Sequence, residues 1–215
     1  KFAYITSHDL KAPLRAIINL ASWIEDDLQG NMPNDVSVNF DLMKGRVKRM
    51  ENLIDGILRY SRADRFHTEH EVFSVIELLT TIIQDLGLLE KDNVQMRLMG
   101  LPKSINTEKI KLSQVISNLI SNAVKYNNAS QIQIEIGGED RKDHYFFYIK
   151  DNGIGIASEY YDKIFLIFQT LEARDKVEST GVGLSIVKKI VTDFGGKVWL
   201  ESVVGKGTSF FFTWK

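Results

Sequence analysis

Cysteine is absent from this 215-residue chain, and proline occurs only three times. Without cysteine there is no disulfide, no thiolate nucleophile and no cysteine-ligated zinc site, and a reducing compartment is permitted. An excess of charge of either sign is also missing, because 27 Lys and Arg stand against 28 Asp and Glu, which gives a formal charge of −1. This balance excludes the overall field of a protein that wraps nucleic acid or lies on anionic lipid.

Long apolar runs are missing as well. No run reaches the roughly 18 to 20 residues of a membrane-spanning helix, and the segment from Lys1 to Tyr4 lacks the features of a signal peptide. We therefore expect no membrane contact within this chain, no nucleic-acid partner and a cytoplasmic location. Because the chain opens inside a helical pattern, we expect it to be a fragment of a longer protein, whose other parts decide any membrane anchoring.

The first third of the chain has the periodicity of two long helices joined by turn formers between Gly30 and Asp35. Apolar or small residues recur at alternating four- and three-residue spacing, which is the seam of a helix bundle. These residues are Ala3, Ser7, Leu10, Leu14, Ile17, Ala21, Ile24 and Leu28, then Val36, Phe40, Met43, Val47, Met50, Ile54 and Ile57. Residues 1–65 are therefore predicted to form a helical hairpin that dimerises into a four-helix bundle, rather than one that packs only on its own chain.

A second domain is predicted at 73–215, after a linker at 66–72 that has no periodicity. Its pattern predicts helices over 75–89, 108–126 and 182–194, and strands over 94–98, 132–136, 145–150, 197–202 and 208–214. Ser74 and Glu77 form a capping box at the start of the first of these helices. Helices interleaved with hairpin-linked strands indicate an α/β sandwich with a mixed or antiparallel sheet, so the fold class of the whole chain is α+β.

The first helix carries an exposed histidine. Leu10 and Leu14 face the predicted seam, which puts His8 on the solvent side with Asp9 beside it. Pro13 lies inside the helix, where it deletes a backbone hydrogen bond and should bend the helix just past His8. A carboxylate bonded to one ring nitrogen would leave the other nitrogen as a nucleophile, whereas a lone exposed histidine is usually only a solvated surface residue.

The helix predicted over 108–126 carries a polar ridge opposite its apolar face. The ridge consists of Gln114, Asn118, Asn122 and Lys125. Asparagines four residues apart lie one above the other on a helix, so their amide oxygens could serve Mg²⁺ with Lys125 near its phosphates. Solvated surface asparagines are the alternative for this helix taken alone.

Glycine-containing segments form the remaining candidates. The segment from Asp151 to Ile156 follows a predicted strand. Its glycines would let the backbone pass close to a flat ligand, and Asp151 could accept a hydrogen bond from an exocyclic amine. Asp-Asn-Gly is also the sequence of an ordinary turn. The segment from Ser179 to Leu184 opens a helix, where free N–H groups suit phosphate, but it matches neither the dinucleotide fingerprint nor a P-loop. The segment from Gly205 to Thr208 is a tight turn between the last two predicted strands.

Taken in order, these segments resemble a two-component sensor histidine kinase over nearly the whole chain. Ser7 to Arg15 looks like the phosphoacceptor box, in a form similar to phytochrome-like kinases. Further boxes follow in the family's order. The segments that resemble them are Asn118–Tyr126 for the N box, Asp151–Ile156 for the first glycine box, Phe165–Gln169 for the F box, and Gly181–Leu184 and Gly205–Thr208 for the second and third glycine boxes.

The resemblance implies a dimerisation and histidine-phosphotransfer hairpin followed by an ATP-binding domain of the histidine kinase and gyrase type. His8 would accept the γ-phosphoryl group of ATP with Asp9 beside it, and then pass it to an aspartate on a response-regulator receiver domain. Asn122 would bind Mg²⁺, Asp151 the adenine, and Lys125 and Tyr126 the phosphates. The other implied ATP-binding residues are Asn118, Gly153, Gly155, Gly181, Gly183, Leu184 and Thr208, and residues 170–180 would form the ATP lid.

Two positions depart from the family pattern. Ser179 stands where many members carry the first glycine of the second glycine box, which bears on how the lid hinges. Ala12 stands where many members carry a Thr or Asn that could hold a water, so we expect weak or absent phosphatase activity toward the regulator.

Two other functions fit the sequence less well. An ATP hydrolase like the topoisomerase and mismatch-repair ATPases would carry a glutamate as base one helical turn before the magnesium asparagine, and this chain has Asn118 there. A signalling scaffold that binds nucleotide without turnover would not need His8, Asn122 and Asp151 together.

Overall fold

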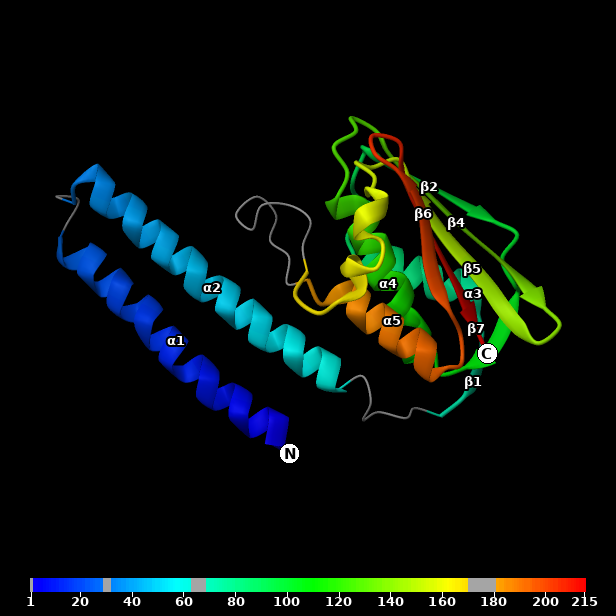
Figure 1. The fold of residues 1–215 in the computed structure, drawn as a ribbon, viewed down its shortest axis with the longest axis horizontal. Coiled ribbons are helices and arrows are strands. Elements are labelled where there is room, and N and C mark those ends of the chain that lie inside the picture. The colour runs from blue at the N-terminus through cyan, green and yellow to red at the C-terminus, as the bar shows by residue number, and fades with distance from the viewer. Residues whose placement is uncertain (1, 29–31, 63–68, 170–180) are drawn as a thin grey trace.

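The structure is a computed structural model that describes residues 2–28, 32–62, 69–169 and 181–215, without the side chains of residues 2–10, 59, 61 and 62. The predicted ATP lid at 170–180 lies outside the described residues, as does the part of the predicted linker before residue 69. Two parts are visible in Figure 1: a pair of long helices, and an α/β sandwich beside them.

The long helices are α1 (Phe2–Asp27) and α2 (Asn34–Arg62), which confirm the predicted helical hairpin. Among the seam residues, Leu14, Ala21 and Val47 are buried within this one chain. Ion pairs between Lys11 and Asp55 and between Glu25 and Lys44 join the two helices.

A five-stranded mixed sheet forms the centre of the sandwich, with the strand order β2-β4-β5-β7-β6. The strands are β2 (Val94–Met99), β4 (Ile132–Arg141), β5 (His144–Asp151), β6 (Val198–Val203) and β7 (Gly207–Trp214). β2 runs parallel to β4, and the other neighbours are antiparallel. The predicted mixed sheet is therefore confirmed.

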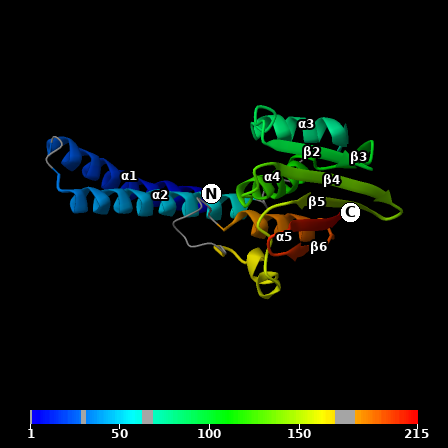
Figure 2. The same ribbon diagram turned by 90° about the horizontal axis from the view of Figure 1, so that it is seen from above.

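Three helices pack with this sheet: α3 (Val75–Asp85), α4 (Lys109–Lys125) and α5 (Gly183–Asp193). Strand residues alternate between the two faces of a sheet, and the alternate residues Ile134, Ile136, Phe147, Ile149 and Phe212 are buried in the same core as the apolar sides of the helices. Figure 2 shows the hairpin extending away from the sandwich, with α4 and α5 at the end nearest to α2.

The helix predicted over 75–89 begins as expected and ends early. The backbone N–H of Glu77 donates to Ser74 Oγ at 3.3 Å, which is one half of the predicted capping box. The helix stops at Asp85 because Gly87 has a φ of +62°, so that Gly87 N–H bonds to Gln84 O and Leu88 N–H to Ile83 O. This pair of bonds is the Schellman motif, which ends helices at a left-handed glycine.

A small second sheet was not predicted. β1 (Glu71–Ser74) pairs antiparallel with β3 (Ser104–Thr107). The short helices η1 (Ser158–Tyr160) and η2 (Lys163–Phe165) were also missed. The fully buried Trp214 of β7 ties the two sheets together, because its Nε1–H donates to Thr107 Oγ1 at 2.8 Å.

Candidate active site

Two adjoining cavities lie where α4 meets the start of α5. The larger has a volume of about 500 Å³, which is in the range of small-molecule sites, and the smaller has about 90 Å³. Asn122, Tyr126 and Leu184 line both cavities, so the two form one continuous site. The larger cavity is lined by the whole polar ridge predicted on α4: Gln114, Asn118, Asn122 and Lys125. The ridge therefore faces a cavity and not bulk solvent.

Asp151, the last residue of β5, lies in the smaller cavity. Its Oδ1 accepts the backbone N–H of Gly153 at 2.8 Å and that of Thr208 at 3.1 Å. Burial raises the pKa of Asp151, and these two hydrogen bonds oppose the rise. Among the residues that the structure describes, none donates to Asp151 Oδ2, so this oxygen can accept a hydrogen bond from a ligand.

Glycine is required around Asp151 because backbone segments meet there. A Cβ on Gly207, which has a φ of +106°, would stand 2.0 Å from the backbone oxygen of Asp151. A Cβ on Gly153 would stand 2.5 Å from Tyr126 O, and one on Gly155 would stand 2.2 Å from Val203 O. These glycines let three loops close around the carboxylate. Of the predicted residues here, Gly155 and Thr208 line the smaller cavity, whereas Gly153 supports it through its N–H.

The start of α5 borders the larger cavity. Gly181 and Gly183 both line it, and among the described residues no side chain caps the helix at Val182. Free N–H groups and the positive end of the helix dipole at such a start favour an anion. Asn118 Nδ2 donates to Gln114 O at 2.8 Å, which leaves its Oδ1 as an acceptor near Gly183.

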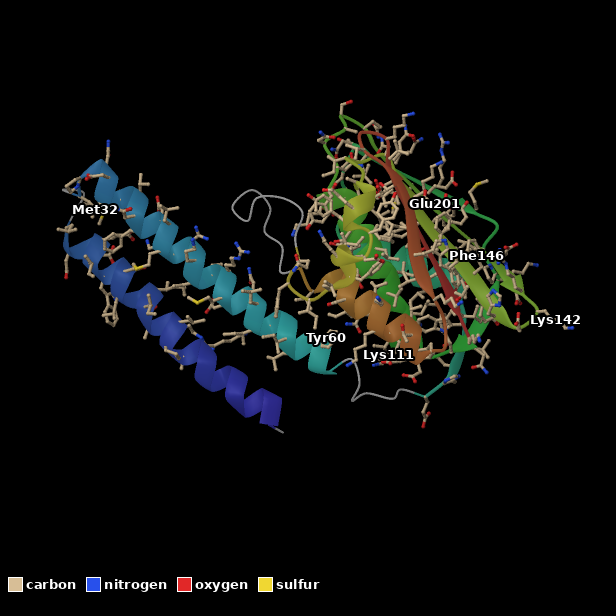
Figure 3. The ribbon with its side chains drawn as sticks, viewed as in Figure 1. Met32, Tyr60, Lys111, Lys142, Phe146 and Glu201 are labelled. Atoms are coloured by element: carbon tan, nitrogen blue, oxygen red, sulfur yellow. The ribbon has the colours of Figure 1, made fainter. Side chains whose placement is uncertain are left out.

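One wall of the larger cavity comes from the hairpin, through Asn52, Asp55 and Gly56 of α2. Sequence reasoning missed these residues, although a glycine inside a helix, where it costs about 1 kcal/mol against alanine, is a signal of close approach. Tyr60, near the end of α2 (labelled in Figure 3), adds a second contact, because Lys189 Nζ lies 4.5 Å from its ring centroid. The α5 helix is therefore held against α2.

His8 and Asp9 belong to α1, and their side chains lie outside the described part of the chain. Lys11 lies about one helical turn after His8, and it forms an ion pair with Asp55, which lines the larger cavity. The turn of α1 that follows His8 is thus connected to the cavity wall.

The rest of the described chain offers few competing sites. In the described ranges, no group of three or more His, Cys, Asp and Glu side chains is placed to hold a metal ion. No helix of the described residues combines the length and apolarity needed to span a membrane.

Comparisons with known proteins identify two families along the chain. Residues 1–66 match the His Kinase A (phospho-acceptor) domain, and residues 107–215 match the Histidine kinase-, DNA gyrase B-, and HSP90-like ATPase family. The chain is 38% identical over 215 residues to cyanobacterial phytochrome B of Nostoc sp., covering 99% of this chain and 29% of the relative. It therefore spans less than a third of that phytochrome's length.

Solved structures share the fold. ShkA, full-length and in complex with AMPPNP, superposes with a TM-score of 0.70 at 19% identity, over 99% of this chain and 45% of ShkA. ThkA in complex with the response regulator protein TrrA has a TM-score of 0.63 at 22% identity, over 97% of this chain and 60% of ThkA. Since the two family matches account for most of the chain in the expected order, the chain belongs to the histidine kinases, with a phospho-acceptor domain followed by an ATPase domain of the gyrase and HSP90 type.

Proposed function

We propose that this chain is the catalytic core of a sensor histidine kinase, which moves the γ-phosphoryl group of ATP to His8 and then to an aspartate of a response regulator. One observation carries the proposal: the carboxylate of Asp151, the polar ridge of α4 and the uncapped start of α5 surround one continuous site beside the hairpin that contains His8. An ATP analogue bound to ShkA, which shares this fold, supports the same ligand class.

The adenine would occupy the smaller cavity. Its exocyclic amine would donate to Oδ2 of Asp151, and its flat faces would pack against apolar side chains. Those apolar side chains are Ile154, Ile156, Ile164, Leu184 and Phe210. Tyr126 lies on both cavities, between the adenine end and the phosphate end.

The phosphates would extend into the larger cavity, toward Lys125 and the start of α5 at Gly181 and Gly183. The residues there fit Mg²⁺, because the amide oxygens of Asn118 and Asn122 are the hard oxygen ligands that this ion takes, and they would hold it beside the phosphates. We assign Asn122 as its ligand, and a bound Mg²⁺ would neutralise part of the phosphate charge.

His8 would attack the γ-phosphorus through one ring nitrogen while Asp9 holds the ring. A nitrogen–phosphorus bond forms, the bond from the γ-phosphorus to the bridging oxygen breaks, ADP leaves, and the imidazole loses its proton. The ion pair of Lys11 with Asp55 supports the approach, because it joins the turn after His8 to the wall of the phosphate end.

We further propose a homodimer through the hairpin, with the boundaries 1–65 for the hairpin, 66–72 for the linker and 73–215 for the ATP-binding domain. The support is the seam: Ile24 and Ile57 are 47% and 50% exposed in the single chain. Other exposed seam residues are Ile17, Leu28, Met43 and Met50. A two-fold partner would cover this stripe.

The partner that receives the phosphoryl group would be a receiver domain, because ThkA, which shares this fold, forms a complex with the response regulator TrrA. A cytoplasmic location is proposed with it, since the reaction consumes ATP.

The test uses ATP labelled on its γ-phosphate. The chain should acquire a label that is acid-labile and alkali-stable, as a phosphoramidate is, and His8→Ala should lose it while retaining ATP affinity. His70→Ala is the matched control, because His70 is an exposed histidine before the ATP-binding domain. An acid-stable label, or a label that persists in His8→Ala, would refute the assignment of His8.

A further inference from the structure

A third cavity, here called the outer cavity, lies on the face of the main sheet opposite the buried core. Its volume is about 190 Å³, less than half that of the larger cavity of the ATP site. Glu135 of β4 and Lys150 of β5 line it and lie opposite each other in the strand register, whereas the neighbouring Ile136 and Ile149 are buried in the core. Because successive side chains of a strand point to opposite faces, the sheet separates the outer cavity from the core.

Three basic side chains from three parts of the sheet line the outer cavity. Arg97 belongs to β2, Lys150 to β5, and Lys206 to the turn between β6 and β7. None of these side chains forms a hydrogen bond or an ion pair with any residue that the structure describes. Gln95 and Gln133 add amide groups that can donate to the same ligand. Unpaired positive charge from distant segments of the chain therefore gathers at one place.

The carboxylates of this region leave that charge uncompensated. Glu135 lies between Arg97 and Lys150 in the strand register, but its Oε1 accepts the hydroxyl of Tyr148 at 2.9 Å. Asp151 contributes to the cavity wall, yet its Oδ1 accepts backbone N–H groups on the adenine side of the sheet. Three basic side chains against the one carboxylate of Glu135 leave an excess of two positive charges in the outer cavity.

The wall of the outer cavity is held in place by Asn152. Its Oδ1 accepts the backbone N–H of Gln133 at 2.8 Å and the side-chain amide of Asn127 at 3.0 Å. Its Nδ2 donates to Gln131 O at 2.9 Å. These bonds fix the loop after β5 against β4 without a ligand, so that binding has little ordering of the wall to pay for.

The chemistry of these groups points to a phosphate group. A guanidinium binds two phosphate oxygens with parallel N–H bonds, and lysine supplies compact charge beside it. A phosphate monoester carries about −1.5 to −2 charges near pH 7, which matches the excess of two, whereas a carboxylate carries only one charge. The volume is below the roughly 300 to 1,000 Å³ of sites for larger ligands, so the occupant is little larger than phosphate itself. We propose that the outer cavity binds the phosphate group of a small molecule, at a site separate from that of ATP.

Nuclear magnetic resonance of the whole isotope-labelled chain tests this site, with inorganic phosphate as the probe. Saturating ADP fills the ATP site, and sodium chloride keeps the ionic strength constant. Phosphate should shift the backbone amides of Gln95, Gln133 and Lys150 in a saturable manner. The absence of saturable shifts at these amides would overturn the proposal, including the case in which only residues of the ATP site respond.

Substitutions of the basic residues identify the groups that bind. Arg97→Gln should weaken phosphate binding about tenfold, because it removes a charged donor, and Lys206→Gln should weaken it as well. Lys142→Gln is the matched control, because Lys142 is exposed at the other end of β5 from Lys150 (labelled in Figure 3). Equal weakening by Arg97→Gln and Lys142→Gln would mean that only net charge matters, which would refute the site. Since all these side chains are exposed, the variants should fold, and the amide spectrum itself reports the fold.

Two further probes test the assignment to a phosphate group. Methyl phosphate keeps the charge and three of the oxygens, and it should bind within about threefold of inorganic phosphate. Dimethyl phosphate has a single charge, and it should bind about tenfold more weakly. Failure of methyl phosphate to bind, or equal affinity for dimethyl phosphate, would overturn the assignment.

Discussion

A Cβ atom on Gly56, toward the C-terminal end of α2, would stand 2.6 Å from Cγ2 of Val182, which is buried at the start of α5. Only a residue without a side chain lets the two helices meet at this point. Because Gly56 and Val182 both line the larger cavity, the fit of hairpin to ATP-binding domain and the shape of the phosphate end depend on the same contact.

Gly56→Leu should separate the two parts of the chain, because a leucine cannot occupy the space of Val182. We expect a larger radius of gyration by small-angle X-ray scattering, together with weaker ATP binding, because the same contact shapes the phosphate end of the larger cavity. Gly45→Leu is the matched control: Gly45 lies in the same helix, and a Cβ there would meet nothing within 4 Å. Equal radii for both variants would contradict the expectation.

Introducing a charge into the exposed seam should weaken the dimer. Ile24→Asp places a carboxylate where a two-fold partner would bury an apolar side chain, at a cost of several kcal/mol. Sedimentation should show a dimer for the wild-type chain at micromolar concentration and a monomer for this variant. Ile110→Asp serves as control, since Ile110 is 61% exposed on α4, far from the hairpin seam in sequence. A monomeric wild-type chain would remove the basis for the dimer.

Asp151→Asn should weaken ATP binding by about 1.5 to 3 kcal/mol, because an amide nitrogen or a neutral oxygen replaces the charged acceptor for the exocyclic amine. Isothermal titration at neutral pH measures the change. Wild-type affinity in this variant would mean that the adenine lies elsewhere.

The same residue gives a pH dependence with a defined sign. Burial raises the pKa of Asp151 in the folded protein above that of the unfolded chain. Its contribution to stability is therefore complete below the unfolded pKa and is lost as the pH rises through the folded pKa. We expect Asp151→Asn to raise the melting temperature of the nucleotide-free protein at neutral pH, and ATP affinity of the wild type to fall as acidification reaches the raised pKa.

Ala12 should leave the protein with little phosphatase activity. The residue is exposed on α1 in the turn after His8, and a methyl group neither donates nor accepts a hydrogen bond to position a water. The half-life of the phosphorylated regulator, measured with ADP and an excess of the chain, should stay within about tenfold of the regulator alone, which is about 1.4 kcal/mol of barrier. A greater shortening would show that another group positions the water.

Local periodicity predicted most of the fold. The helical hairpin and the five strands of the main sheet have strong repeating patterns, and their positions are confirmed, except that β4 runs five residues beyond the predicted 132–136. β1 and β3 were missed because each is only four residues long and is defined by its pairing with the other. The early end of α3 depends on Gly87, a glycine in the left-handed conformation, and the spacing of apolar residues does not predict that conformation.

The candidate site was predictable where its residues lie on one element. The ridge of α4 and the loop after Asp151 could be read from spacing, and both line the cavities. Asn52 and Asp55 could not, since they join the site only through the packing of α2 against the second domain.

The place of β7 in the sheet has a kinetic consequence. It follows β5 and β6 in the chain, yet it lies between them and pairs with both. Until it inserts, β5 and β6 expose open edges that invite wrong pairing, and closing such long-range contacts is slow. Thr208, which bonds Asp151, belongs to this strand. During refolding, the chain should therefore gain the ability to bind nucleotide only when β7 inserts into the sheet. Nucleotide binding would then report the final folding step.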